Sequence, residues 1–195
     1  MNSVGVFCGS NEGARPEYRQ AATALGAAIA RRGWKLVYGG ANVGLMGAVA
    51  DAALAEGGRV TGIIPHSMVA KEIAHQGLTE LHTVNTLYER KAMMAELSDA
   101  FVSLPGGYGT LDEMFEMLTW SQIGTHLKPS GLLNIAHYFD PLIALLDHAV
   151  AERFLHARHR GMLLTNDDPD RLLDLLTANP VQPYDKWIDR HTAKD

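Results

Sequence analysis

The stretch that decides the fold is residues 100–113, Ala-Phe-Val-Ser-Leu-Pro-Gly-Gly-Tyr-Gly-Thr-Leu-Asp-Glu. Its apolar start over 100–104 is typical of a strand buried on both faces, and the glycines that follow indicate a tight turn. Thr110 and Glu113 then have the spacing of a capping box, which predicts a helix to about Ser121. A strand, a glycine turn and a helix in this order form the unit of a helix-covered parallel sheet.

The same unit recurs along the whole chain. We expect strands at 3–8, 35–38, 59–64, 81–84, 100–104, 131–134 and 162–165. Helices are expected at 16–32, from the 39–47 glycine turn to 56, after Thr86, at 110–121, at 140–152 and after Asp168. This pattern predicts an α/β fold, a Rossmann-like doubly wound parallel sheet of about seven strands with helices on both faces. The expected strand order is 3-2-1-4-5-6-7.

Two segments are harder to read. Residues 66–77 are expected to form a partly helical excursion over the sheet edge, and the tail from about 180 is expected to be irregular. No repeat or linker divides the chain, and its 195 residues with 47% hydrophobic composition suit a single domain over 1–195.

Charge and cysteine content limit the classes of partner. The net charge of -5 and the absence of a basic patch argue against nucleic-acid binding. The lone Cys8 excludes an internal disulfide and fits a reducing, cytoplasmic compartment. No leader pattern and no apolar run of membrane-spanning length is visible, so we expect no membrane association.

Three glycine clusters follow predicted strands. They are Gly9-Ser10, Gly39-Gly40 with Gly44 and Gly47, and Gly106-Gly107 with Gly109. Ligands of such sheets bind at the carboxyl ends of the strands, where unpaired N–H groups of helix starts suit a phosphate. The alternative for any one cluster is a tight turn without a ligand.

Two familiar phosphate motifs are excluded. A P-loop requires Lys-Ser or Lys-Thr after its last glycine, whereas Leu45-Met46 follow Gly44. A dinucleotide fingerprint requires its glycines after the first strand and an acidic residue after the second, which here ends in Tyr38-Gly39. NAD binding is therefore not expected.

Glu113 is the main catalytic candidate. On a helical projection, apolar residues cover an arc of roughly 220°, and Glu113 projects inside that arc between Met117 and Trp120. Partial desolvation would tune the ionisation of such a carboxylate. The alternative is that Glu113 only completes the capping box with Thr110.

Arg90 is expected about one turn into the helix after the fourth strand, as Glu113 is after the fifth. If those strands are neighbours, the guanidinium and the carboxylate share one cleft. Arg90 can bind phosphate or carboxylate bidentately, and Lys91 adds a second positive charge. The alternative is that Glu89, Arg90 and Lys91 form a solvated helix face.

Other candidates are weaker. His156 and His159 lack a third ligand, so no metal site is expected, and no cofactor is required. Cys8 is interpreted as a small core residue rather than a reactive thiol. The methionines at helical spacing indicate core or subunit interface; they are Met93, Met94, Met114 and Met117.

The stretch from Pro105 to Glu113 resembles the signature of the LOG (lonely guy) family of cytokinin riboside 5′-monophosphate phosphoribohydrolases. Further segments resemble that family in the same order and cover roughly residues 4 to 176: 6–10, 38–40, 44–47, 89–92 and 119–122. One departure is Ala41-Asn42, where many members carry another glycine.

The resemblance implies a set of site residues. Glu113 and Arg90 would be the catalytic pair, and Thr119 and Glu72 would line the pocket. Lys91 and the 106–112 turn would hold the nucleotide. The full binding set comprises Gly9, Ser10, Gly39, Gly40, Gly44, Met46, Gly47, Glu72, Lys91, Pro105, Gly106, Gly107, Tyr108, Gly109, Thr110, Leu111, Asp112 and Thr119.

The resulting hypothesis is hydrolysis of the N-glycosidic bond of adenosine 5′-monophosphates, plain or N6-substituted, to a free base and ribose 5-phosphate. The lysine decarboxylase label given to some relatives is rejected, because no lysine site supports pyridoxal-phosphate chemistry. The main alternative is a nucleotide- or cofactor-binding protein like the molybdenum-cofactor carriers, and a purely interacting protein is the weakest. The apolar helix that carries Glu113 suggests a homodimer.

Overall fold

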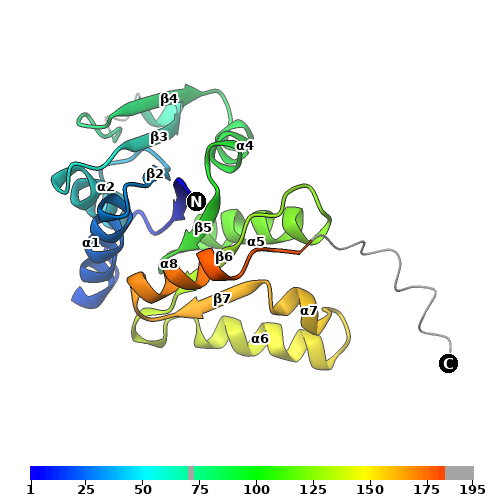
Figure 1. Cartoon of the computed structure of the whole chain (residues 1–195). Helices are drawn as coiled ribbons and strands as arrows, with labels where there is room; N and C mark the ends of the chain where they lie inside the picture. The colour runs from blue at the N-terminus through cyan, green and yellow to red at the C-terminus, as the bar shows by residue number, and fades with distance from the viewer. Residues whose placement is uncertain (70–72, 183–195) are drawn as a thin grey trace, which may run out of the picture.

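The computed structural model describes residues 1–69 and 73–182. These residues form a seven-stranded sheet, parallel throughout and flanked by helices (Figure 1). The strands are β1 (Ser3–Phe7), β2 (Lys35–Tyr38), β3 (Val60–Pro65), β4 (Glu80–Val84), β5 (Ala100–Ser103), β6 (Ser130–Leu133) and β7 (Leu163–Asn166). The predicted α/β class and doubly wound sheet are confirmed.

The helices follow the strands along the chain. They are α1 (Pro16–Arg31), α2 (Gly44–Ala55), α3 (His66–Val69), α4 (Leu87–Leu97), α5 (Tyr108–Gln122), α6 (Asp140–Ala151), α7 (Ala157–Arg160) and α8 (Pro169–Ala178), with a 3-10 turn η1 (Ile135–His137). None of the helices in the described ranges is both long and apolar enough to cross a membrane.

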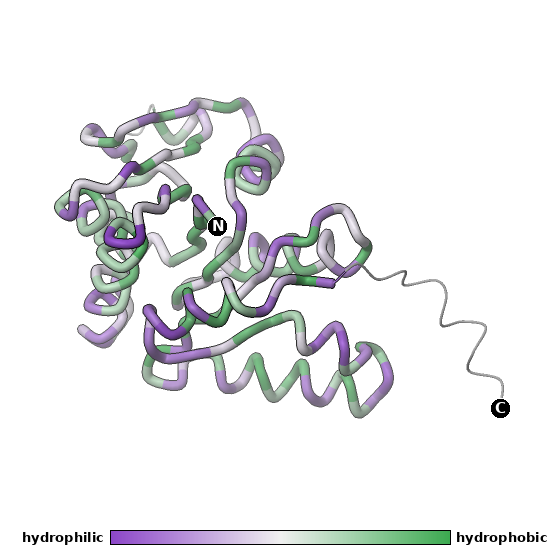
Figure 2. Tube along the Cα trace, in the orientation of Figure 1, coloured by the Kyte–Doolittle hydropathy of each residue, from purple (hydrophilic) through white to green (hydrophobic). Residues whose placement is uncertain are grey.

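Alternate residues of the central strands point to opposite faces and create two apolar layers. Val4 and Val6 pack with α1, α2 and α8, whereas Phe7 packs with α4 and α5 on the other face. A third cluster joins α5 to β6 and α6 through Met114 and Leu132. In Figure 2, hydrophobic and hydrophilic residues alternate along the turns of α6.

The strand order is β4-β3-β2-β1-β5-β6-β7, so the predicted order 3-2-1-4-5-6-7 is wrong in one position. The fourth strand pairs with β3 at the sheet edge instead of lying between β1 and β5. Its residues fit this position, because Glu80 and Thr83 are exposed, and polar side chains are typical of edge strands. The chain thus builds the sheet from β1 outward to β4 on one side and from β5 outward to β7 on the other. The carboxyl ends of β1 and β5 lie next to each other at the point where the order reverses.

Helix starts follow the predicted signals in two cases. The Thr86 side chain accepts a hydrogen bond from Glu89 N, and Asp168 caps α8 by accepting one from Arg171 N. The third prediction, a capping box of Thr110 with Glu113, is wrong. α5 begins two residues before Thr110, with Gly107 at its N-cap and no side-chain cap.

The segment after β3 is partly helical, as predicted, with the single turn α3. The chain then pairs with the loop after β2 through an antiparallel bridge between Ala41 and Ala74. Asn42 N donates to Ile73 O at 2.9 Å, and His75 N donates to Gly40 O at 2.9 Å. This segment therefore braces the second glycine loop. Residues 183–195 of the tail that was expected to be irregular lie outside the described residues.

Candidate active site

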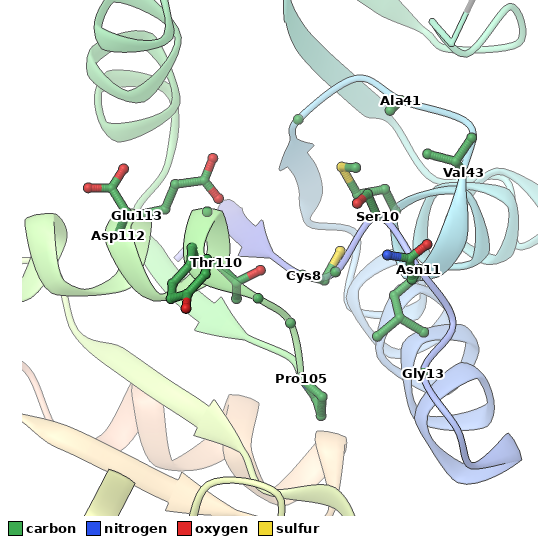
Figure 3. A pocket seen from close by; sticks show the side chains of 18 of the residues that line it. Cys8, Ser10, Asn11, Gly13, Ala41, Val43, Pro105, Thr110, Asp112 and Glu113 are labelled. Carbon is green, nitrogen blue, oxygen red and sulfur yellow. The ribbon is translucent and has the colours of Figure 1, made fainter. Parts of the chain in front are cut away.

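The loops that follow β1, β2 and β5 surround a cavity of about 630 Å³ at the carboxyl edge of the sheet. This edge is where ligands of doubly wound sheets bind, at the point of chain reversal between β1 and β5. Figure 3 shows Asp112 and Glu113 on one side, Ser10 and Asn11 facing them, and Cys8 between. All three predicted glycine clusters thus contribute residues to one cavity.

Close backbone contacts hold the loops together. Gly9 N donates to Pro105 O at 3.0 Å, and Leu45 N donates to Gly9 O at 3.1 Å. Gly44 adopts a positive φ of 57°, and a Cβ there would lie 2.3 Å from the carbonyl carbon of Ser10. No larger residue fits this contact without displacing the first loop or the start of α2.

The start of α5 faces the cavity. Leu111 N donates to Gly107 O at 3.1 Å, so the N–H groups of Tyr108, Gly109 and Thr110 precede the first helical hydrogen bond. These donors and the positive end of the helix dipole favour an anion such as phosphate. Thr110 is buried, and a Cβ at Gly106 would meet its Oγ1. Its hydroxyl thus lies beneath the turn.

Arg90 and Glu113 form a buried ion pair that lines this cavity. Arg90 Nη2 donates to Glu113 Oε1 at 2.7 Å, and the side chains are 11% and 10% exposed. Arg90 Nε is buried and has no hydrogen-bond partner among the described residues. The Arg90 side chain is therefore mostly buried, and the interpretation of Arg90 as part of a solvated face is wrong.

Arg90 reaches Glu113 by a route that strand adjacency did not predict. From the edge strand β4, α4 packs over β3, β2 and β1 before the chain enters β5. The guanidinium lies against the loop after β2, where a Cβ on Gly39 would be 2.4 Å from Arg90 Nη2. Glycine at position 39 thus makes room for the arginine.

The ionisation of Glu113 is set by opposing effects. Burial raises its pKa above the usual value by penalising the carboxylate, and Arg90 is the strongest influence that lowers it. Asp112 and Glu116 add to the increase, whereas Lys91 opposes it. The outcome is a raised pKa for a carboxyl group that faces a cavity, which is a feature of functional sites.

Lys91 is held beside this pair. Its Nζ lies 2.9 Å from Asp112 Oδ2 and 3.0 Å from Glu116 Oε2. Partial burial alone would lower its pKa, but the hydrogen bonds to the two carboxylates outweigh burial and raise it. Lys91 therefore remains protonated and adds positive charge to the cavity wall.

Cys8 lies on the cavity floor but is 8% exposed, and burial raises the pKa of its thiol. A thiol of raised pKa is a poor nucleophile, which favours the interpretation of Cys8 as a core residue. Among residues 1–69 and 73–182, no cluster of three or more His, Cys, Asp or Glu side chains is arranged to hold a metal ion.

Most of the predicted site residues line this cavity. They are Gly9, Ser10, Gly39, Met46, Arg90, Lys91, Pro105, Gly106, Gly107, Tyr108, Gly109, Thr110, Asp112 and Glu113. Gly40, Gly44 and Gly47 shape the second loop without lining it, and Leu111 packs against the cluster around Met114.

Thr119 and Glu72 do not join this group. Thr119 is exposed further along α5, where its hydroxyl donates to Phe115 O at 2.7 Å, and it does not line this cavity. Glu72 lies outside the described residues.

Sequence reasoning missed several cavity residues, of which Tyr18 and Tyr138 are the largest. Tyr138 follows β6 at the carboxyl edge of the sheet, so its position after a predicted strand was a usable signal. Tyr18 comes from the first helix turn, and nothing in its local sequence distinguishes it.

Comparison with known proteins identifies sequence relatives over most of the chain. A family model described as "Possible lysine decarboxylase" matches residues 46–176. The cytokinin riboside 5′-monophosphate phosphoribohydrolase of Rhodococcoides fascians is 52% identical over 167 residues, which are 85% of this chain and 84% of that protein. The protein of that name from Arabidopsis thaliana is 44% identical over 185 residues, 95% of this chain and 86% of that protein.

Solved structures with the same fold are more distant in sequence. A molybdenum cofactor binding protein from Rippkaea orientalis matches with a TM-score of 0.71 and 24% identity over 91% of this chain and 96% of that one. The molybdenum cofactor carrier protein of Chlamydomonas reinhardtii gives 0.69 and 22% over 92% and 99%. At these identities the likeness concerns the fold alone.

Proposed function

Because this chain belongs to the LOG (lonely guy) family of cytokinin riboside 5′-monophosphate phosphoribohydrolases, we propose that it hydrolyses the N-glycosidic bond of adenosine 5′-monophosphates, plain or N6-substituted. The products are ribose 5-phosphate and a free base. The observation that carries the proposal is the buried Arg90–Glu113 pair in a cavity that also receives the start of α5.

The start of α5 is the proposed site of the 5′-phosphate. Its unpaired N–H groups and dipole attract the phosphate dianion, and Lys91 lines the same cavity. Glu113 lies five residues further along the helix, roughly 8 Å at 1.5 Å per residue. This offset is comparable to the reach from a 5′-phosphate to C1′ of its ribose.

Glu113 is the proposed stabiliser of the transition state. When the bond from C1′ to the base breaks, its electron pair leaves with the base and the sugar becomes cationic. A carboxylate next to the ring stabilises this charge more than it stabilises the neutral sugar, so the barrier falls. Water then adds its oxygen to C1′, with Glu113 as the group that orients it or accepts its proton, and the base gains a proton.

Arg90 is the proposed partner that keeps Glu113 ionised and oriented. The guanidinium opposes the effect of burial on the carboxylate and fixes one of its oxygens by a short hydrogen bond. Because Arg90 lines the cavity, its guanidinium is also the proposed contact for a ribose hydroxyl.

A lysine decarboxylase activity does not fit the lysine that lines the cavity. Such chemistry uses a pyridoxal phosphate bound to a lysine as a Schiff base, which requires a neutral amine at the moment of attack. Lys91 is paired with two carboxylates and has a raised pKa, so it is poorly suited to that role.

The decisive experiment is a product assay with a matched pair of variants. Purified protein is incubated with AMP, N6-substituted AMP and the unphosphorylated nucleosides, and free base is measured by chromatography. Glu113→Gln keeps the shape of the side chain and removes its charge, so kcat should fall on the order of a thousand-fold. Glu96→Gln makes the same change at an exposed position of α4 and should preserve activity.

The alternative, a protein that binds nucleotide without reacting, predicts a different result. The wild type would then retain AMP through gel filtration and release no base. Equal turnover by Glu113→Gln and wild type would remove Glu113 from the mechanism.

We also propose a homodimer located in the cytoplasm. Exposed apolar side chains on the outer helices support the dimer: Phe115 and Ile123 near α5, and Leu145 on α6. The buried free thiol of Cys8 suits a reducing compartment. Light scattering after gel filtration and fractionation of cells test the two statements.

A further inference from the structure

The segment between β6 and α6 has an unusual backbone. Ala136 and His137 are consecutive non-glycine residues with positive φ angles of 50° and 61°. Each such residue costs roughly 1 kcal/mol, because Cβ crowds the backbone in the left-handed region. Strain of this kind persists only where the surrounding structure imposes it.

Asn134 and Phe139 fix the two ends of this turn. Asn134 N donates to Asn166 O at 2.8 Å, and the Asn134 side chain accepts from Phe139 N at 2.7 Å. Phe139 is buried in the cluster of β6 and α6. The strained residues are thus held between a strand end and a core anchor, and the residue that follows them is Tyr138.

Tyr138 reaches the phosphate-binding turn. Its hydroxyl donates to Gly106 O at 2.6 Å, and its ring packs edge-on against Tyr18 with centroids 5.8 Å apart. Both tyrosines line the cavity. A side chain from the loop after β6 therefore holds the turn that follows the neighbouring strand β5.

The turn needs such support because packing does not restrain it at Gly107. A Cβ at Gly107 or at Gly109 would meet no atom within 4 Å, so their surroundings are open. Upstream, Gly9 N holds Pro105 O, and downstream Thr110 is buried. Gly106 itself lies close to Thr110 and Gly9, so the peptide between Gly106 and Gly107 is packed on one side and open on the other.

We propose that Tyr138 is a positioning residue for the 5′-phosphate site. In a trans peptide the C=O and N–H bonds lie in one plane and point in opposite directions, so a hydrogen bond to Gly106 O also fixes the direction of Gly107 N–H. This N–H group, which directly precedes the donors at the start of α5, is then oriented before the phosphate arrives, and less conformational entropy is lost on binding. This role rests on the proposed function of the site.

Tyr138→Phe tests the inference, because it removes the hydroxyl and keeps the ring against Tyr18. One hydrogen bond of this kind changes binding by roughly five-fold. We expect the Kd for ribose 5-phosphate, measured by calorimetry, and the KM for AMP to rise by about that factor. The kcat should stay within about two-fold, since Tyr138 does not touch the reacting bond.

Tyr88→Phe is the matched control, because it removes the same group from a tyrosine that is 66% exposed on α4. It should leave Kd, KM and Tm unchanged. Unchanged Kd and KM in Tyr138→Phe, or a fall in kcat at constant KM, would overturn the positioning role, as would a wild type that does not bind ribose 5-phosphate. Base release by the wild type reports separately on the proposed function, so each can fail without the other.

Discussion

At the scale of the residue, the site depends on a carboxyl group held between two opposing influences. The Glu113 side chain is 10% exposed, and burial favours its neutral form. Arg90 Nη2 lies 2.7 Å from Glu113 Oε1, and its positive charge favours the carboxylate form. A buried pair of this kind adds little net stability, because desolvation of both charges offsets their attraction. Its benefit is an anion whose hydration has already been removed before the substrate arrives.

The raised pKa of Glu113 predicts the acid side of the activity profile. In the proposed mechanism the active form is the carboxylate, so kcat/KM should fall as pH decreases through this pKa, and the fall should begin at higher pH than for an ordinary glutamate. Arg90→Gln removes the main influence that lowers the pKa of Glu113, so the loss of activity in acid should begin at a higher pH than in the wild type. Asp112→Asn removes an influence that raises this pKa, so the loss of activity should begin at a lower pH. Shifts in the same direction would contradict this electrostatic explanation.

At the scale of the element, contacts between helices place the glycine loops. α1 and α2 lie side by side on one face of the sheet (Figure 1). A Cβ on Gly26 of α1 would lie 2.2 Å from Val49 O of α2, so the two backbones are almost in contact. The start of α2 at Gly44 in turn touches the loop after β1. The α1–α2 distance therefore controls one wall of the cavity.

Gly26→Ala should consequently destabilise the protein although alanine is the better helix former. The backbone carbonyl of Val49 cannot yield as a flexible side chain does, so the helices must separate, at a net cost of about 2 kcal/mol. Urea unfolding measures this difference, and KM for AMP should rise because α2 moves. Ala24→Ser, on the exposed face of α1, should change stability by less than about 0.5 kcal/mol. Equal stability of Gly26→Ala and wild type would show that α1 and α2 leave room for a Cβ at position 26, which contradicts the close contact with Val49 O.

The sequence predicted the presence of the helices better than the residues at which they begin. Thr86 and Asp168 cap their helices through their own side chains, and such local chemistry is readable along the chain. Thr110 has the same spacing to Glu113 but lies inside the first turn of α5, with its hydroxyl beneath Gly106. The local signal was overridden by the fit of the turn against the loop after β1.

At the scale of the whole molecule, the central strands couple the two faces of the sheet. β1 contributes Val6 to the cluster under α1 and α2 and Phe7 to the cluster under α4 and α5. The loops of the candidate site follow β1, β2 and β5, and β1 pairs with both β2 and β5. Loss of one apolar layer would therefore expose the strands that support the other.

This coupling predicts cooperative unfolding of one domain. Trp34 packs against the first cluster, and Trp120 packs against the second. In variants that retain only Trp34 or only Trp120 of the three tryptophans in the chain, fluorescence should report the same urea midpoint, coincident with far-ultraviolet circular dichroism. Two separate midpoints would instead indicate that the two layers unfold independently.

The sequence by itself determined the α/β class, the seven strands in their chain order and the glycine loops after β1, β2 and β5, because periodicity and turn chemistry act over short distances. Only the tertiary structure decided that β4 lies at the edge and that α4 carries Arg90 across the sheet to Glu113. It also decided that the Tyr138 hydroxyl donates a hydrogen bond to Gly106 O in the turn after β5. The physical reason is that strand pairing and side-chain approach depend on burial between segments far apart in the chain, and no local pattern encodes these distances.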